Sequence, residues 1–131
     1  MHPKTMLLRR RLIAYADYCI AFKRLAQYKD FAAEVGMTPA NLHIADQLAW
    51  LAEYDAMMGR PLRSSIFVRQ PETDDQGVII KHSVPGKGYF DFCNQNQLIK
   101  QPMTGIDFWK EQLRNLGYVT TDVHTKYGII L

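Results

Sequence analysis

An apolar stripe with helical spacing runs through the first 26 residues, and it constrains the fold more than any other feature. Within about residues 6–27, apolar side chains recur at intervals of three and four residues, at Leu8, Leu12, Tyr15, Cys19, Phe22 and Ala26. An α-helix turns once in about 3.6 residues, so this spacing places the stripe on one side of a helix. Such a helix needs its stripe buried, which predicts that other elements pack against it.

Two more helices are predicted before residue 59. The segment YKDFAAEVG, residues 28–36, favours a short helix, and Gly36 suits the left-handed conformation that ends many helices. Thr38 and Pro39 match an N-cap and a first helical position. The helix that they open runs to about Met58 and ends at Gly59. The first 58 residues therefore predict a three-helix layer.

The spacing of apolar residues changes after this layer. Residues 64–69 and 78–82 are short β-branched or aromatic runs, and the polar segment PETDDQG lies between them. This arrangement predicts an antiparallel hairpin with a long loop. A helix is favoured over a strand for residues 89–98, and residues 107–116 predict another helix, which Gly117 ends. The apolar tail, residues 123–131, is expected to dock on the core as a strand beside the hairpin.

These elements predict an α+β fold. It has an N-terminal three-helix layer, winged-helix-like, with a small antiparallel sheet and C-terminal helices. The 131 residues, of which 47% are hydrophobic, match one domain that spans residues 1–131 and buries one core. Trp50, Phe67 and Trp109 lie in strongly apolar segments and are expected in that core.

Cysteine content and the first residues indicate the cellular setting. Only Cys19 and Cys93 are present, which favours two buried free thiols over a disulfide framework. Arginines interrupt the first apolar stretch, unlike in a signal peptide, and no apolar run approaches the roughly 18 residues of a membrane span. We therefore expect a cytoplasmic protein that makes no membrane contact.

The sequence contains no recognisable catalytic or metal site. The four histidines are scattered, at His2, His43, His82 and His124. None forms a pair at helical spacing with another histidine or a cysteine, so we expect no metal and no cofactor. We assign no catalytic residue, because no serine has the surroundings of a nucleophile elbow. A small enzyme is the alternative, with His82 approaching Cys93 or Asp91 as a nucleophile–base pair.

Charge is distributed unevenly along the chain. Residues 1–29 contain seven basic side chains and one acidic one, whereas residues 30–58 contain five acidic side chains and no Lys or Arg. A basic surface would attract a phosphate backbone or an acidic protein. Its candidate residues are Arg9, Arg10, Arg11, Arg60, Arg63 and Arg69. The alternative is that the basic first helix and the acidic third helix face each other, or that both simply solvate the surface.

Lys87 is a seventh candidate binding residue. It lies in the sequence Pro85-Gly86-Lys87-Gly88, before a predicted helix. Backbone N–H groups at a helix start, together with a lysine, can bind an anion. The segment lacks the spacing of a phosphate-binding loop, so a plain structural turn is the alternative.

One resemblance concerns DNA binding. The segment YKDFAAEVG, followed by a helix that begins at a proline, resembles the Tyr-Gly-Glu-Ile-Ala segment of alkyltransferase-like DNA-binding proteins, where it opens the winged-helix part. The resemblance covers about residues 28–90, with the hairpin as the wing, and implies nucleic-acid binding. The reactive Pro-Cys-His-Arg motif is absent, so alkyl transfer is not implied. The would-be recognition helix is acidic, which opposes its insertion into a groove lined by phosphates.

A second resemblance rests on the stretches RPLRSSIFV, PGKGYF and FWKE, within residues 60–111. They are similar to a group of small uncharacterised bacterial and mobile-element proteins. Those proteins share a Pro-Leu-x-Ser strand, a Pro-Gly-x-Gly-Phe-Phe loop and a Phe-Trp-x-Glu helix, and here Tyr89 replaces the first Phe of the loop. This resemblance implies a shared fold and no known chemistry.

The sequence as a whole predicts a non-enzymatic binding module, winged-helix-like and associated with nucleic acid. The alternative is a protein-interaction module, such as an inhibitor or immunity-type protein of a mobile element. The small enzyme is the third hypothesis. The expected partner is nucleic acid or an acidic protein.

Overall fold

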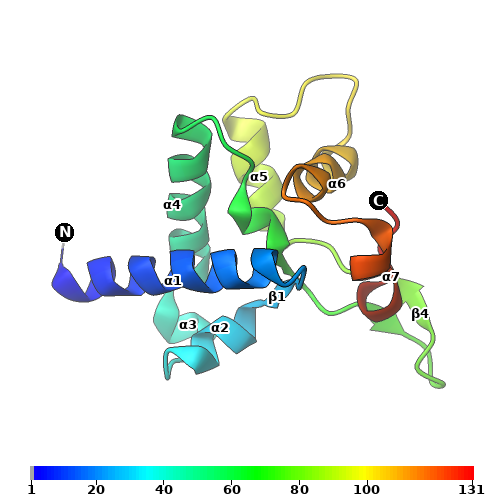
Figure 1. The fold of residues 1–131 in the computed structure, drawn as a ribbon, viewed down its shortest axis with the longest axis horizontal. Coiled ribbons are helices and arrows are strands. Elements are labelled where there is room, and N and C mark those ends of the chain that lie inside the picture. Colours follow the sequence, from blue (N-terminus) through cyan, green and yellow to red (C-terminus); the bar gives the residue numbers. More distant parts are fainter. Residues whose placement is uncertain (1) are drawn as a thin grey trace.

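The computed structural model describes residues 2–131, which form an α+β fold (Figure 1). Its helices are α1 (Pro3–Ala21), α2 (Tyr28–Glu34), α3 (Pro39–Leu42), α4 (Ile44–Met57), α5 (Lys87–Gln95), α6 (Gly105–Asn115) and α7 (Thr120–Tyr127). Its strands are β1 (Ala26–Gln27), β2 (Phe67–Val68), β3 (Glu72–Thr73) and β4 (Ile79–Lys81), and a 3₁₀ turn, η1, spans Arg63–Ile66. Helix α1 contacts both α4 and η1, while α7 lies beside the β3–β4 hairpin at the end of the molecule away from the N-terminus (Figure 1).

The N-terminal helices agree with the sequence prediction in outline but differ from it at two points. Helix α1 ends at Ala21 rather than near residue 27, because Lys23 is left-handed (φ 56°) and the chain turns towards β1. The predicted third helix is divided into α3 and α4 at His43, whose φ of 52° does not fit a right-handed helix. Thr38 caps α3 as predicted, since its Oγ1 accepts the N–H of Asn41 at 3.2 Å.

The predicted hairpin is partly wrong. Residues 63–66 form η1, and β2 pairs in parallel with β1, with Ala26 opposite Phe67. The antiparallel hairpin consists of β3 and β4 alone, further along the chain. Phe67 and Val68 are both fully buried. Two consecutive buried residues are typical of a strand covered on both faces, whereas a hairpin with one solvated face alternates apolar and polar residues.

The C-terminal half is more helical than predicted. Helix α5 confirms the helix favoured for residues 89–98, and α6 begins at Gly105 because Thr104 Oγ1 caps it, accepting the N–H of Asp107 at 3.1 Å. The strand predicted within residues 123–131 is wrong. Its first residues belong to α7, which ends at the left-handed Gly128 (φ 73°). The tail is docked as expected, because Ile129 is fully buried.

The short connection between α1 and α2 joins distant parts of the chain. The hydroxyl of Tyr118 donates to the carbonyl of Arg24 (2.6 Å), and the hydroxyl of Tyr127 donates to the carbonyl of Leu25 (3.3 Å). These partners lie 94 and 102 positions apart in the sequence. These two bonds tie the connection to residues 118 and 127, near the other end of the described chain.

Aromatic side chains occupy much of the core. Phe67 and Trp109 are fully buried, as predicted, whereas Trp50 is only partly buried. The indole N–H of Trp109 donates to the carbonyl of Ser65 (2.9 Å), and its ring stacks on His82 with 6.2 Å between ring centres. Trp109 therefore connects α6 to η1 and to the segment after β4.

Cys19 and Cys93 are buried free thiols, as the sequence predicted. None of the helices within residues 2–131 combines the length and the apolar character that a membrane crossing needs.

We expect Trp109→Ala to lower the free energy of unfolding by about 3–5 kcal/mol, because it replaces a fully buried indole with a cavity. Trp50→Ala should cost less, since Trp50 is only partly buried. Denaturant unfolding followed by far-UV circular dichroism measures both variants. Equal losses would contradict the central position of Trp109.

Candidate functional site

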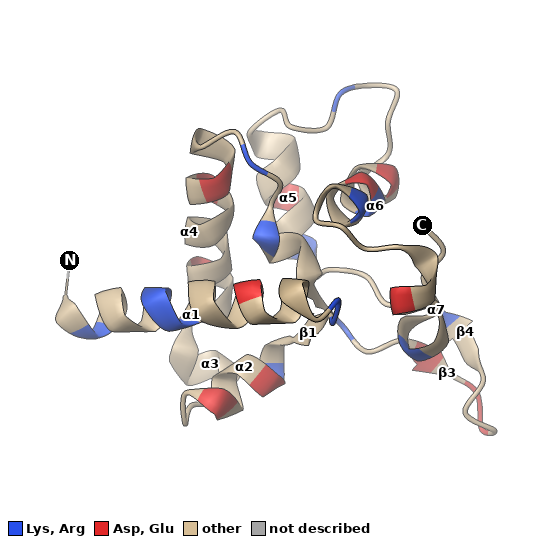
Figure 2. Ribbon diagram, in the orientation of Figure 1, with Lys and Arg blue, Asp and Glu red and all other residues tan. Residues whose placement is uncertain are grey.

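The arginines predicted to share one surface lie on several different elements (Figure 2), and Arg63 is buried. Arg63 is only 4% exposed. Its Nε and Nη2 donate to the buried carboxylate of Asp55 in α4, the shortest bond being 2.8 Å, and its Nη1 donates to Asp17 in α1 at 3.0 Å. Burial opposes the charge, but the hydrogen bonds to the two carboxylates outweigh burial and raise the pKa of Arg63. Arg63 therefore links η1 to two helices and offers no free surface to a phosphate.

The first helix contacts α4 through Arg9. The Nε of Arg9 donates to Gln47 Oε1 at 3.3 Å, and its guanidinium lies 4.7 Å from the ring centre of Trp50. At this position the basic first helix packs against α4 through a neutral amide and an aromatic ring. Arg10 and Arg11 are exposed on α1.

Arg60 and Arg69 lie on other elements. The Nε of Arg60 is 3.7 Å from Oδ1 of Asp55, and the Arg60 side chain is 45% exposed. Arg69 is exposed after β2, beside the pocket between α4 and α5. Because Arg63 is buried and Arg9 is held against α4, the six arginines do not form one continuous basic surface.

We expect Asp55→Ala to destabilise the fold by about 3–5 kcal/mol, because it leaves the buried charge of Arg63 without its main partner. The matched control is Glu72→Ala, which breaks the exposed pair with Lys81 (3.9 Å) and should cost less than about 1 kcal/mol. Urea unfolding of the three proteins measures the difference. Similar small losses in both variants would show that the buried pair has no special structural role.

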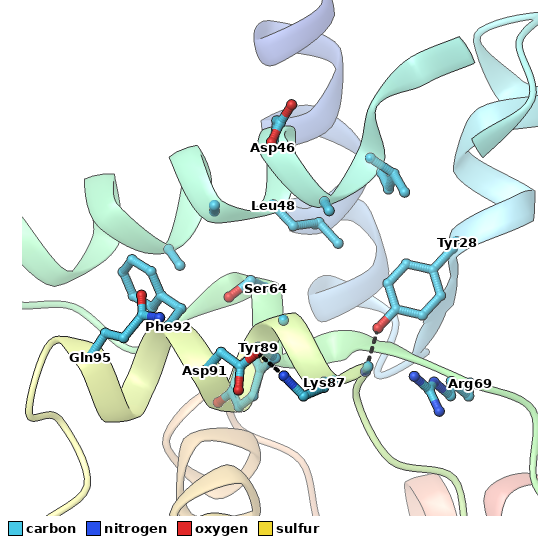
Figure 3. Close-up of a pocket in the computed structure, with 16 residues that line it drawn as sticks. Tyr28, Asp46, Leu48, Ser64, Arg69, Lys87, Tyr89, Asp91, Phe92 and Gln95 are labelled. Carbon is cyan, nitrogen blue, oxygen red and sulfur yellow. Dashed lines mark hydrogen bonds and ion pairs between the residues drawn. The ribbon is translucent and has the colours of Figure 1, made fainter. Parts of the chain in front are cut away.

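A pocket of about 490 Å³ lies between α4 and α5 (Figure 3). Small side chains of α4 make room for it, because Ala45, Ala49 and Ala52 recur at helical spacing along its wall. Leu48 of α4 and Phe92 of α5 add apolar surface. The pocket is therefore mostly apolar, and its volume lies within the usual range of ligand sites.

Polar groups gather at the end of the pocket where α5 begins (Figure 3). The hydroxyl of Tyr28 accepts the backbone N–H of Gly86 (2.7 Å) and donates to the carbonyl of Phe67 (3.3 Å). Burial raises the pKa of this phenol. Arg69 lies beside them, since a methyl group on Gly86 would be 3.8 Å from the Arg69 Nε. Among residues 2–131, no carboxylate forms an ion pair with Arg69.

Lys87 occupies the first position of α5, at the same end of the pocket. Its Nζ pairs with Asp91 one turn later, at 2.7 Å, and both side chains are substantially exposed. Of the seven predicted binding residues, the pocket brings together Arg69 and Lys87. It is not lined by Arg9, Arg10, Arg11, Arg60 or Arg63.

Sequence reasoning missed most of the pocket, including Ser64. This residue lines the pocket, is 4% exposed, and its Oγ has no hydrogen-bond partner among the described residues. It lies in a run that predicts a buried strand, so nothing in the run distinguished the hydroxyl. The repeated alanines of α4 are a usable signal, because small residues along one helix face leave space beside it.

The residues of the enzyme alternative are arranged unfavourably for nucleophilic chemistry. Cys93 is fully buried beside Tyr89, and burial raises the pKa of its thiol to about 12. Only the thiolate is a strong nucleophile, so Cys93 is protonated and inert at neutral pH. His82 stacks on Trp109, and its Nδ1 lies 2.9 Å from the carbonyl of Ser83. Within residues 2–131, no three His, Cys, Asp or Glu side chains are grouped to hold a metal ion.

We expect neither Cys19 nor Cys93 to react with Ellman's reagent in the folded protein at neutral pH, because burial raises the pKa of both thiols. Both should react rapidly after unfolding in guanidinium chloride. Absorbance of the released thionitrobenzoate measures the two rates. Rapid labelling of Cys93 in the folded protein would instead favour a reactive nucleophile.

Comparisons with known proteins assign no family to the chain. No protein-family model matches it, and no curated protein and no solved structure matches it. The two resemblances drawn from sequence motifs therefore stay predictions. The case for a function rests on the pocket and on the placement of charge.

Proposed function

We propose that this chain is a non-enzymatic binding module whose partner is a protein, and that the partner inserts an apolar side chain between α4 and α5. The observation that supports this proposal most directly is the pocket itself, with an apolar wall from each helix and one cationic end. Binding energy at protein interfaces is concentrated in buried anchor side chains that fill such pockets. A volume of about 490 Å³ accommodates one large side chain with part of its backbone.

Two exposed methionines lie at the end of α4, outside the lining of the pocket. Met57 is 79% exposed and Met58 is 63% exposed, at the end of the helix that forms one wall of the pocket. Methionine is flexible and polarizable, so it adapts to the shape of a partner, and it is enriched at protein interfaces. The two methionines are therefore suited to the rim of a protein interface centred on the pocket.

The placement of charge favours a protein over duplex DNA. Affinity for duplex DNA depends on several phosphate contacts made by one basic surface. Here Arg63 is buried and Arg9 is held against Trp50, which leaves Arg10 and Arg11 as exposed neighbours on α1. The exposed acidic residues of α4 would repel a phosphate backbone. An inhibitor or immunity-type role is one form that a protein-interaction module of this kind takes.

The experiment combines crosslinking with a pair of matched variants. A photo-crosslinking amino acid at Gln95, an exposed residue that lines the pocket, should capture the partner in source cells. The same group at Asp75, in the hairpin loop, should not capture it. Mass spectrometry then identifies the captured protein, which is purified for binding measurements.

We expect Ala49→Trp to weaken binding of that partner at least about tenfold, because the indole fills the pocket. Ala33→Trp is the control, since Ala33 is also an exposed helical alanine but lies outside the pocket. It should change the affinity by less than about twofold, and circular dichroism should show both variants folded. Isothermal titration calorimetry measures the affinities. Equal affinity of the two variants would contradict docking in the pocket.

Random duplex DNA provides the contrasting test. At low salt we expect no mobility shift, because the six predicted arginines do not form one continuous basic surface. A shift that weakens with salt, and that Arg10→Glu with Arg11→Glu abolishes, would support nucleic-acid binding and contradict the proposal. Both arginines are exposed, so the double substitution should leave the fold intact.

A further inference from the structure

We infer that the α5 end of the pocket is a subsite for a carboxylate, and that the partner enters it with its free C-terminal carboxylate while its last side chain fills the apolar part. The inference rests on the proposed function and deepens it, because it names the chemistry of the segment that docks. Three groups support it independently: the N-terminus of α5, the unpaired hydroxyl of Ser64, and the cation Arg69.

The first turn of α5 has backbone donors without acceptors. The helix has nine residues, no side chain caps its N-terminus, and no acidic residue lies in its first turn. The N–H of Gly86 donates to the hydroxyl of Tyr28, whereas the N–H groups of Lys87 and Gly88 have no acceptor among the described residues. Unpaired N–H groups at a helix start attract anions, since they carry the positive end of the helix dipole.

Ser64 is an independent indication that a polar ligand group enters the pocket. Its side chain is almost fully buried, and its Oγ lacks a partner within the described protein. Figure 3 shows this hydroxyl in the space between α4 and α5. Buried hydroxyls in proteins are nearly always hydrogen-bonded, so an unpaired one beside a pocket indicates a missing acceptor or donor. A carboxylate or backbone carbonyl of a docked segment would supply it.

Gly88 has no role within the fold that requires a glycine. Its backbone is not left-handed, and a methyl group added to it would meet no atom within 4 Å. Glycine inside a helix is less favourable than alanine, so Gly88 makes the fold less stable than an alanine at this position would. Glycine is used where a ligand must approach the backbone closely, and Gly88 lines the pocket at the first turn of α5.

Arg69 gives the subsite its charge, and the local balance favours a monovalent anion. Lys87 is neutralised by Asp91, whereas no carboxylate within residues 2–131 pairs with Arg69. The Asp46 carboxylate, although part of the lining, lies on the side of α4 away from α5 (Figure 3). A guanidinium binds a carboxylate through two parallel N–H bonds, which suits one Arg69 and one carboxylate.

The position of the subsite indicates a chain terminus. The carboxylate subsite and the apolar walls belong to one pocket of about 490 Å³. In a C-terminal residue, the carboxylate and the side chain are attached to the same Cα atom, so one residue fills both parts. Capture of a C-terminal carboxylate by backbone N–H groups is an established mode of peptide recognition. The side chain of an internal Asp or Glu would place its carboxylate in the subsite and leave the apolar part empty.

The test uses two matched peptides, N-acetyl-Gly-Phe as the free acid and the same peptide as the C-terminal amide. Both are titrated into the ¹⁵N-labelled protein, and amide shifts are followed by NMR. We expect the acid to bind at least about tenfold more tightly than the amide and to shift the N–H signals of Lys87 and Gly88. Arg69→Gln should remove this preference, whereas Lys100→Gln, at an exposed lysine outside the pocket, should retain it.

Gly88→Ala provides a second readout that distinguishes binding from folding. The added methyl group fits the free protein, so the melting temperature should rise by about 1–4 °C, while binding of the acid weakens because the methyl group obstructs the first turn. Equal binding of acid and amide in the pocket would overturn the carboxylate subsite and leave the proposed docking intact. Absence of pocket shifts with either peptide would also overturn it. The proposed function would fail separately, if Ala49→Trp retained the affinity of the crosslinked partner.

Discussion

The buried ion pair between Arg63 and Asp55 is the interaction on which the rest of the structure depends. Removing two charges from water is costly, and such a pair persists only when its geometry satisfies almost every hydrogen bond. Asp55 meets that condition by accepting from Nε, Nη2 and the backbone N–H of Arg63. The remaining Nη1 reaches Asp17, so α1, η1 and α4 are held together at one point. Because α4 is fixed in this way, its alanines line an open space beside α5.

The sequence predicts a helix correctly where the helix has its own apolar spacing or capping residues. The apolar spacing in the first 26 residues predicts α1. Gly36 predicts where α2 ends, and Thr38 predicts where α3 begins. The pairing of β1 with β2 could not be predicted, because two residues at Ala26–Gln27 carry no strand pattern and their partners lie 41 positions later. Residues 123–131 predict a strand because the last three are apolar, whereas residues up to Tyr127 belong to α7 and Gly128 is left-handed.

The site follows from the sequence only in part. The sequence predicts Lys87 as a binding residue because it lies in a glycine-rich turn before a helix, and it predicts Arg69 only as one of six arginines of a basic surface. The burial of Arg63 was not visible, because its two acidic partners lie 8 and 46 positions away and the fold alone brings them together. The role of Ser64 in the pocket could not be predicted for a related reason. The sequence around a serine in an apolar run does not indicate whether its hydroxyl has a hydrogen-bond partner in the fold.

The connection after α1 has a consequence for the order in which the chain folds. Its carbonyls at Arg24 and Leu25 receive bonds from Tyr118 and Tyr127. During synthesis on the ribosome, these bonds cannot form until nearly all of the described residues have emerged. The connection after α1 is therefore made long before Tyr118 and Tyr127 are available to bond to it. Contacts across such long loops also slow folding, since each loop loses entropy before the contact gains stability. The interval between the synthesis of α1 and that of α7 is therefore the period in which the nascent chain is most exposed to aggregation.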